Sequence, residues 1–127
     1  MTHARDWVLE AASAASSKKA ERIAILDVSK QLVITDYFVI ASGGNERQVR
    51  TIAEEVERRL ATAYQVKPFR REGEREGRWV LLDYVDFVVH VFLREEREYY
   101  DLERLWSDAP VMHYGDEWET ERAAEAT

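Results

Sequence analysis

The 127-residue sequence predicts an α/β fold in which helices flank a mixed β-sheet. Two short apolar segments in the first 42 residues are typical of buried strands. A long segment with apolar residues at helical spacing follows them. Two more apolar segments, joined by two residues, then predict an antiparallel hairpin. Strands and helices that alternate in this way pack as layers around one core, and the length fits one domain.

The first half is expected to form a helix, two strands and a second helix. Residues 4–20 are rich in alanine and have an apolar side, which favours a helix. Strands are expected at 23–29, where apolar residues are almost continuous, and at 37–42, where aromatic and β-branched residues dominate. The second helix should follow a cap at Asn45 and end near Tyr64, because its apolar residues recur every three or four positions.

The second half is expected to form the hairpin and a last helix. The charged segment 67–78 should be a loop, with a short edge strand near Phe69 as an option. The hairpin strands are predicted at 78–84 and 87–93, with Val85 and Asp86 between them.

The last helix is predicted at 95–107, where Tyr99, Leu102 and Trp106 have helical spacing, and Pro110 should end it. The acidic segment from Met112 onward is expected either to fray or to form a short helix.

Composition excludes several classes of protein. The chain contains no cysteine, which excludes disulfides, thiolate zinc sites and cysteine nucleophiles. It has no apolar run long enough to span a membrane and no secretory signal pattern, so we expect a soluble cytoplasmic protein without membrane contact.

Charge is unevenly distributed. Residues 94–127 hold 11 acidic and 4 basic residues, which accounts for the net charge of −7. Phosphate backbones are bound by clustered Lys and Arg, so this chain is expected to make little direct contact with RNA. Its acidic character suits a basic protein partner, although an acidic tail can also serve solubility alone.

The two faces of the predicted hairpin differ. Because side chains alternate along a strand, one face carries six residues that should pack on helices: Val80, Leu82, Tyr84, Phe87, Val89 and Val91. The other face mixes aromatic residues with an acid and a histidine: Trp79, Leu81, Asp83, Val88, His90 and Phe92. Left open, this second face would be an interaction surface; covered by another helix, it would be part of the core. The pattern favours neither alternative.

Catalytic and metal-binding signals are weak, so no cofactor is expected. The turn at residues 42–45 precedes a helix but matches no phosphate-binding motif, and we interpret it as a turn with a cap. Asp83 and Asp86 could hold a divalent metal, but their Asp-x-x-Asp spacing at a turn need not bring them together. His90 has no evident triad partner. A minimal metal-dependent nucleotidyltransferase remains an alternative.

Three segments resemble a known family. Residues 36–43 (DYFVIASG), 77–92 (GRWVLLDYVDFVVHVF) and 97–106 (REYYDLERLW) are similar to signatures of the ribosomal silencing factor (Iojap-like) family. The resemblance covers about residues 5–110. It implies a silencing factor domain at 1–110 and leaves 111–127 as an acidic C-terminal extension.

The resemblance implies a nucleotidyltransferase-like fold without catalytic residues, and hence no enzyme. Members of the family bind large-subunit ribosomal protein fourteen on the large ribosomal subunit. They sterically block joining of the small subunit, repress translation when nutrients are scarce, and form homodimers when free. A dimeric adaptor for another basic protein is the further alternative.

The partner-binding residues are expected in and around the second signature. Matching the family's motif points to Trp79, Asp83, Tyr84, Asp86 and His90, and the mixed hairpin face adds Leu81 and Phe92. The alternation along the strand places Tyr84 on the opposite, apolar face. Val85 departs from the family pattern, in which glycine is frequent, and this leaves the placement of Asp86 open.

Overall fold

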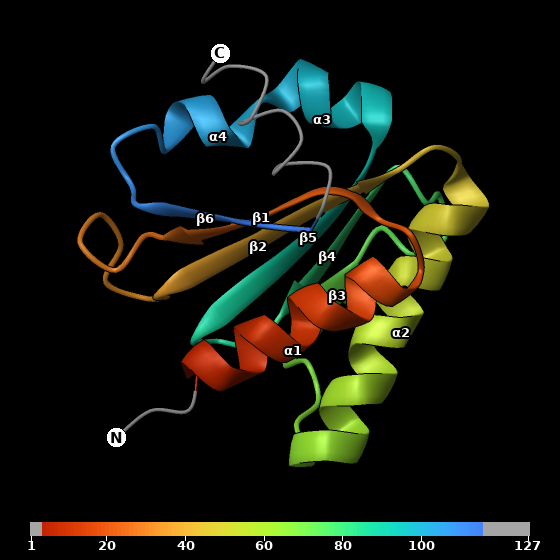
Figure 1. Ribbon diagram of the computed structural model, residues 1–127, viewed down its shortest axis with the longest axis horizontal. Helices are drawn as coiled ribbons and strands as arrows, with labels where there is room; N and C mark the ends of the chain where they lie inside the picture. Colours follow the sequence, from red (N-terminus) through yellow and green to blue (C-terminus); the bar gives the residue numbers. More distant parts are fainter. Residues whose placement is uncertain (1–3, 116–127) are drawn as a thin grey trace.

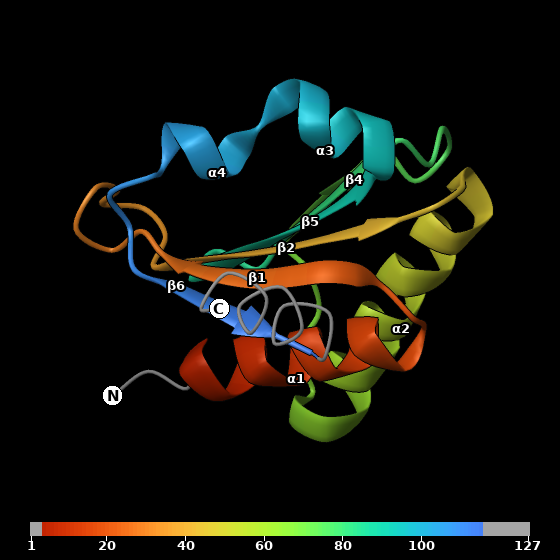
Figure 2. The same cartoon turned by 45° about the horizontal axis from the view of Figure 1, so that its top comes forward.

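The computed structural model describes residues 4–115 and confirms an α/β fold with a six-stranded mixed sheet between two layers of helices (Figures 1 and 2). The helices are α1 (Ala4–Ser17), α2 (Glu46–Tyr64), α3 (Arg94–Tyr100) and α4 (Leu102–Leu105). The strands are β1 (Glu21–Asp27), β2 (Tyr37–Gly43), β3 (Arg70–Glu72), β4 (Trp79–Asp83), β5 (Phe87–Leu93) and β6 (Val111–Tyr114). None of the helices in this part of the chain is long and apolar enough to cross a bilayer.

The strands lie in the order β3-β4-β5-β2-β1-β6. β2 and β5 are parallel, and the other neighbouring strands are antiparallel. A connection of the two residues Val85 and Asp86 predicts that Val80 pairs with Val91 and Leu82 with Val89, and both pairs are observed. The tight connection fixes this register and thereby decides which side chains share a face.

α1 ends three residues earlier than predicted. Lys19 adopts the left-handed conformation, with φ +63°, and the Ala20 N–H donates to the Ala15 carbonyl over 3.1 Å. These two features form a Schellman-type helix end. The chain can therefore turn straight into β1.

The predicted last helix is interrupted. Asp101 adopts φ +46°, and its N–H donates to the Arg97 carbonyl over 2.9 Å, which ends α3 and lets α4 start in a new direction. Residues 111–114 then form strand β6 along β1, so the prediction that the chain beyond Met112 frays or forms a helix is wrong as far as Tyr114. The rest of that tail lies outside the described residues.

Each face of the sheet has its own core. The larger core lies under α1 and α2 and contains all six residues of the predicted apolar hairpin face. Tyr84 belongs to it, and its ring stacks on Phe87 with centroids 4.7 Å apart. The smaller core lies under α3 and α4, on the upper side of the sheet in Figure 2, and includes Phe38, Phe92 and Ala109.

A buried carboxylate ties the two helices of the larger core together. Glu55 of α2 accepts hydrogen bonds from Arg58 (2.6 and 2.9 Å) and Arg59 (3.1 Å). Arg59 also reaches Glu10 of α1 at 3.3 Å. The hydrogen bond from Arg58, followed by that from Arg59, holds the pKa of Glu55 at about 2, below its ordinary value, against the opposing effect of desolvation. Glu55 is therefore ionised and paired at neutral pH.

Candidate functional site

The mixed face of the hairpin is half covered. α3 and α4 lie over its far end, where Phe92 is 1% exposed and joins the smaller core. Trp106 follows α4 and contacts Phe38 edge to face, with centroids 5.6 Å apart. The interpretation that a helix covers this face is thus confirmed near Phe92. Near the β4–β5 turn the same face stays accessible, as Leu81 and Asp83 are both half-buried.

Trp79 joins the sheet to α3. Its indole N–H donates to Nδ1 of His90 over 3.1 Å, and its ring lies 4.8 Å from Phe92 and 4.8 Å from Tyr100 of α3. His90 is 5% exposed, and burial lowers its pKa to about 4. The imidazole is therefore neutral at physiological pH.

A groove of about 380 Å³ occupies the uncovered part of the face. Its floor comes from β2, β4 and β5 and includes Phe38, Leu81, Val88 and His90. Its walls come from the β1–β2 loop, from the segment around β3 and from the β4–β5 turn: Leu32, Ile34, Thr35, Phe69, Arg70, Asp83 and Val85. We refer to this feature as the hairpin groove.

The turn at the end of the hairpin groove is strained. Val85 has φ +74°, and the Asp86 N–H donates to the Tyr84 carbonyl over 2.9 Å, which closes a γ-type turn. Asp83 supports the turn by accepting the Val85 N–H over 2.8 Å. Valine thus adopts a conformation that suits glycine, and the turn leaves both Val85 and Asp86 exposed.

The structure brings together only some of the predicted site residues. Leu81, Asp83 and His90 line the hairpin groove, and Asp86 lies on the turn beside it. Trp79 is half-buried next to the groove against α3.

Two of the predicted residues are enclosed by the fold. Tyr84 points into the larger core, as the strand alternation predicted, and burial raises the pKa of its phenol. Phe92 is covered by α3 and α4, so neither ring is on the surface of the described structure.

Sequence reasoning missed those groove walls that come from loops outside the hairpin. Ile34 and Phe69 are both 81% exposed and stand on loops distant in sequence from the hairpin. The sequence did contain a signal for these walls: both are large apolar residues in segments that form neither strand nor helix. Such residues are usually buried or used for binding. The groove also contains Arg70, which pairs with Asp83 at 3.5 Å.

The two features considered as a metal site and as a phosphate site, Asp83 and the turn before α2, both have local structural roles. Asp83 is occupied by the turn and by Arg70, and residues 4–115 hold no group of three or more His, Asp or Glu side chains placed to ligate a metal. At the turn before α2, Gly44 donates to the Gln48 side chain over 2.7 Å and Asn45 accepts the Gln48 N–H over 2.8 Å. The turn is therefore a helix cap, as interpreted from the sequence.

A charged cleft lies beside this turn, around Arg97. This buried guanidinium donates to Ser42 Oγ over 3.1 Å and to the Glu21 carbonyl over 3.2 Å, and it pairs with Glu103 at 3.0 Å. Arg94 pairs with the Glu21 carboxylate. Because both arginines already have carboxylate partners, the cleft anchors α3 and α4 to the sheet.

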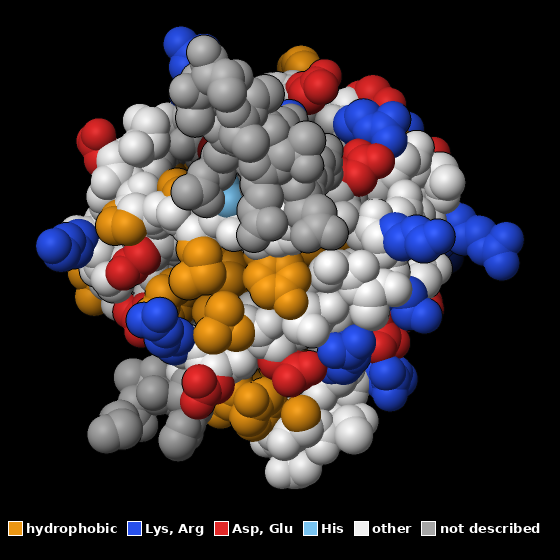
Figure 3. Space-filling model, in the orientation of Figure 1, with side chains coloured by type: hydrophobic (Ala, Val, Ile, Leu, Met, Phe, Trp, Pro, Cys, Tyr) orange, Lys and Arg blue, Asp and Glu red, His pale blue; other side chains and the backbone are white. Residues whose placement is uncertain are grey.

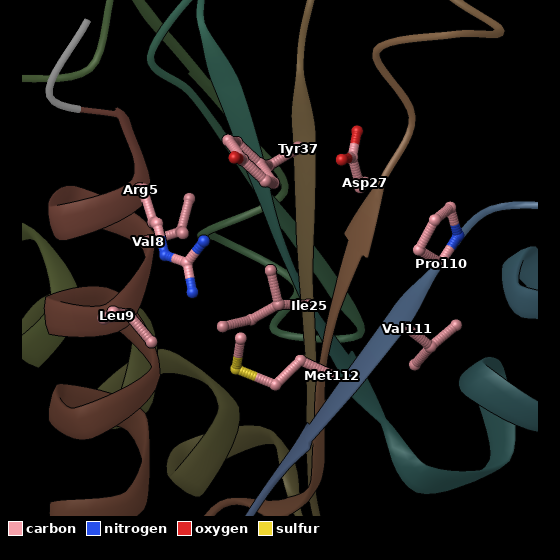
Figure 4. Close-up of a pocket in the computed structure, with 9 residues that line it drawn as sticks. All are labelled: Arg5, Val8, Leu9, Ile25, Asp27, Tyr37, Pro110, Val111 and Met112. Atoms are coloured by element: carbon pink, nitrogen blue, oxygen red, sulfur yellow. The ribbon is translucent and has the colours of Figure 1, made fainter.

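A second apolar hollow, of about 270 Å³, lies between α1 and β6. Figure 3 shows that hydrophobic side chains gather on this face of the molecule. Figure 4 shows the hollow itself, with Arg5 from α1, Tyr37 from β2 and Met112 from β6 around it. None of the predicted site residues lines it, so the hairpin groove is the better candidate for function.

The chain is similar to known proteins along most of its length. The family model described as "Ribosomal silencing factor during starvation" matches residues 1–127. The ribosomal silencing factor RsfS of Bacillus subtilis is 46% identical over 102 residues, which cover 80% of this chain and 85% of that protein. A more distant relative in Mus musculus, "Mitochondrial assembly of ribosomal large subunit protein 1", is 30% identical over 71% of this chain and 40% of that protein.

A crystal structure of a Chromobacterium violaceum protein has the same fold. It superimposes with a TM-score of 0.80 at 36% identity, over 84% of this chain and 88% of that one. On the match over its whole length and the identity to curated members, this chain belongs to the ribosomal silencing factor family.

Proposed function

We propose that this protein represses translation by binding the large ribosomal subunit through large-subunit ribosomal protein fourteen and blocking the joining of the small subunit when nutrients are scarce. Membership of the silencing factor family supports the ribosome as its target. The name of the mouse relative, which refers to the ribosomal large subunit, supports that subunit in particular.

The hairpin groove is the observation that carries the proposal. It combines apolar residues exposed at its rim, Ile34, Phe69 and Val85, with the acidic side chain of Asp83, and the exposed Asp86 lies on the turn beside it. Exposed aromatic and aliphatic residues serve as anchors in protein interfaces, and acidic groups orient a basic partner and speed its approach. A basic ribosomal protein fits both features.

Silencing by this route needs no catalytic chemistry. A folded chain of this size that occupies the joining surface excludes the small subunit by its volume. In the same proposal the protein acts in the cytoplasm and makes little contact with ribosomal RNA, which its net charge of −7 disfavours. We also propose a homodimer for the free protein, on the family resemblance alone.

Trp79 has a supporting part in this site. It is half-buried, and it holds both His90 under the groove and Tyr100 of α3. We expect Trp79 and Phe92 to keep the groove in shape, while Leu81, Asp83 and Asp86 face the partner directly.

Binding to purified large subunits tests the proposal. Phe69→Ala should weaken the affinity by about 2 kcal/mol, roughly thirtyfold, as removal of an aromatic anchor does. Tyr99→Ala is the matched control, because Tyr99 is also 81% exposed but lies on α3 outside the groove, and it should bind like the wild type. Equal affinities of the two variants would remove the hairpin groove from the binding site.

A further inference from the structure

The floor of the hairpin groove contains a hydrogen-bond donor of fixed position. Nδ1 of His90 accepts the indole N–H of Trp79, so the proton of the neutral imidazole must be on Nε2. His90 is a groove residue, and Phe38, packed edge to face against its ring at 4.9 Å, is another. The side chain therefore cannot change its tautomer without losing the bond to Trp79.

Nε2 of His90 is buried and has no hydrogen-bond partner among the described residues. The hydroxyl Oγ1 of Thr35, which lines the same groove, is also buried without a partner. Buried polar groups in folded proteins are nearly always paired, and an exception calls for an explanation. Here one groove contains two such groups, one of which is a donor and the other a hydroxyl that can accept.

The surroundings of these two groups restrict what can pair with them. The floor is otherwise apolar, with Leu81 and Val88 beside His90, so the occupant must present apolar surface. Asp83 on the rim and Asp86 on the turn disfavour an anion, and the cation of Arg70 is already paired with Asp83. The acceptor for Nε2 should therefore be neutral.

We propose that the hairpin groove binds a backbone peptide group of the partner, next to an apolar side chain that fills the groove. The peptide carbonyl accepts the N–H of His90 Nε2, and a peptide N–H donates to Thr35 Oγ1. Each residue of a peptide backbone supplies one acceptor and one donor, and neighbouring residues of the bound segment can provide the two groups that His90 and Thr35 need. This inference rests on the proposed function, since the segment belongs to the large-subunit protein, and it adds the chemistry by which the groove recognises that segment.

Three substitutions separate the donor from the shape of the ring. His90→Asn keeps an acceptor near the position of Nδ1, for Trp79, but removes the Nε2 donor. His90→Gln keeps an N–H donor near the position of Nε2. Thr35→Val is nearly isosteric and removes only the hydroxyl.

Affinities for purified large subunits, measured by co-sedimentation, give the test. His90→Asn and Thr35→Val should each bind about tenfold more weakly than the wild type, since each leaves one buried peptide group unpaired. His90→Gln should stay within about threefold of the wild type, because it preserves the donor. Thermal unfolding of each free variant serves as a control for folding, and Thr35→Val carries the test if a His90 variant does not fold.

The outcomes distinguish this inference from the proposed function. If the wild type binds large subunits, and the folded His90→Asn and Thr35→Val variants bind them as tightly, the peptide-group assignment is overturned and the proposed function stands. Equal weakening of His90→Gln and His90→Asn would also overturn it, since the ring and not the donor would then matter. A wild type that does not bind large subunits would overturn the proposed function, and the inference with it.

Discussion

Replacement of Val85 by glycine should stabilise the protein. Val85 adopts φ +74° in the γ-type turn, a strained conformation for a β-branched residue that costs about 1–3 kcal/mol. Two losses oppose the relief of this strain. Glycine increases the entropy of the unfolded chain by about 0.4–1 kcal/mol, and the half-exposed valine side chain contributes roughly 0.7 kcal/mol of burial.

With the middle value of each range, the net gain is about 0.6 kcal/mol, which corresponds to a rise in Tm of about 2–3 °C for a domain of this size. Thermal unfolding followed by circular dichroism measures it. Val33→Gly is the matched control, because Val33 is fully exposed in the β1–β2 loop and is not among the described residues with positive φ. That variant should lose about 0.4–1 kcal/mol through the unfolded state alone. If Val85→Gly melts below the wild type by as much as Val33→Gly does, the turn holds no strain and the reasoning is refuted.

Three further predictions concern charged groups. Arg97→Met should lower the free energy of unfolding by about 2–4 kcal/mol in urea denaturation, because it leaves buried hydrogen-bond partners unpaired. Arg94→Met is the control: it breaks an exposed ion pair and should cost under about 1 kcal/mol. The folded pKa of Glu55 lies at about 2, so its paired carboxylate stabilises the fold above the ordinary pKa of 4.5 and loses that contribution as pH falls toward 2. Glu55→Gln should accordingly be less stable than the wild type at pH 7, and the difference should vanish only below pH 2. Asp83→Asn combined with Asp86→Asn should slow association with large subunits at low salt and have little effect at high salt. Stopped-flow kinetics measure the association rate, and an unchanged rate at low salt would mean that the turn does not face a basic partner.

Local patterns in the sequence predicted the central part of the fold. Alternating side chains and a two-residue connection fixed the hairpin register, which the pairing of Leu82 with Val89 confirms. The same pattern placed Tyr84 correctly in the core, although the family signature had suggested a surface role. Helical spacing and the Asn45 cap likewise predicted α2 closely.

Features that depend on contacts between distant segments were not predictable in this way. β6 is only four residues long, too short for its own pattern to predict a strand, and it forms because β1 offers an edge to pair with. The helix break at Asp101 lies in a segment whose apolar residues have helical spacing, so the spacing did not predict it. Phe92 belongs to the core because α3 and α4 cover it. The groove walls at Ile34 and Phe69 come from loops that only the folded sheet brings to the hairpin.

The central claim is that this protein keeps the ribosomal subunits apart by occupying the large one. Sucrose-gradient sedimentation of purified large and small subunits, at a magnesium concentration that normally joins them, tests it most directly. With the protein present, the account predicts that the subunits stay separate and that the protein migrates with the large subunit, whereas Phe69→Ala restores joining and Tyr99→Ala does not. Complete joining of the subunits, with the protein left at the top of the gradient, would contradict the account.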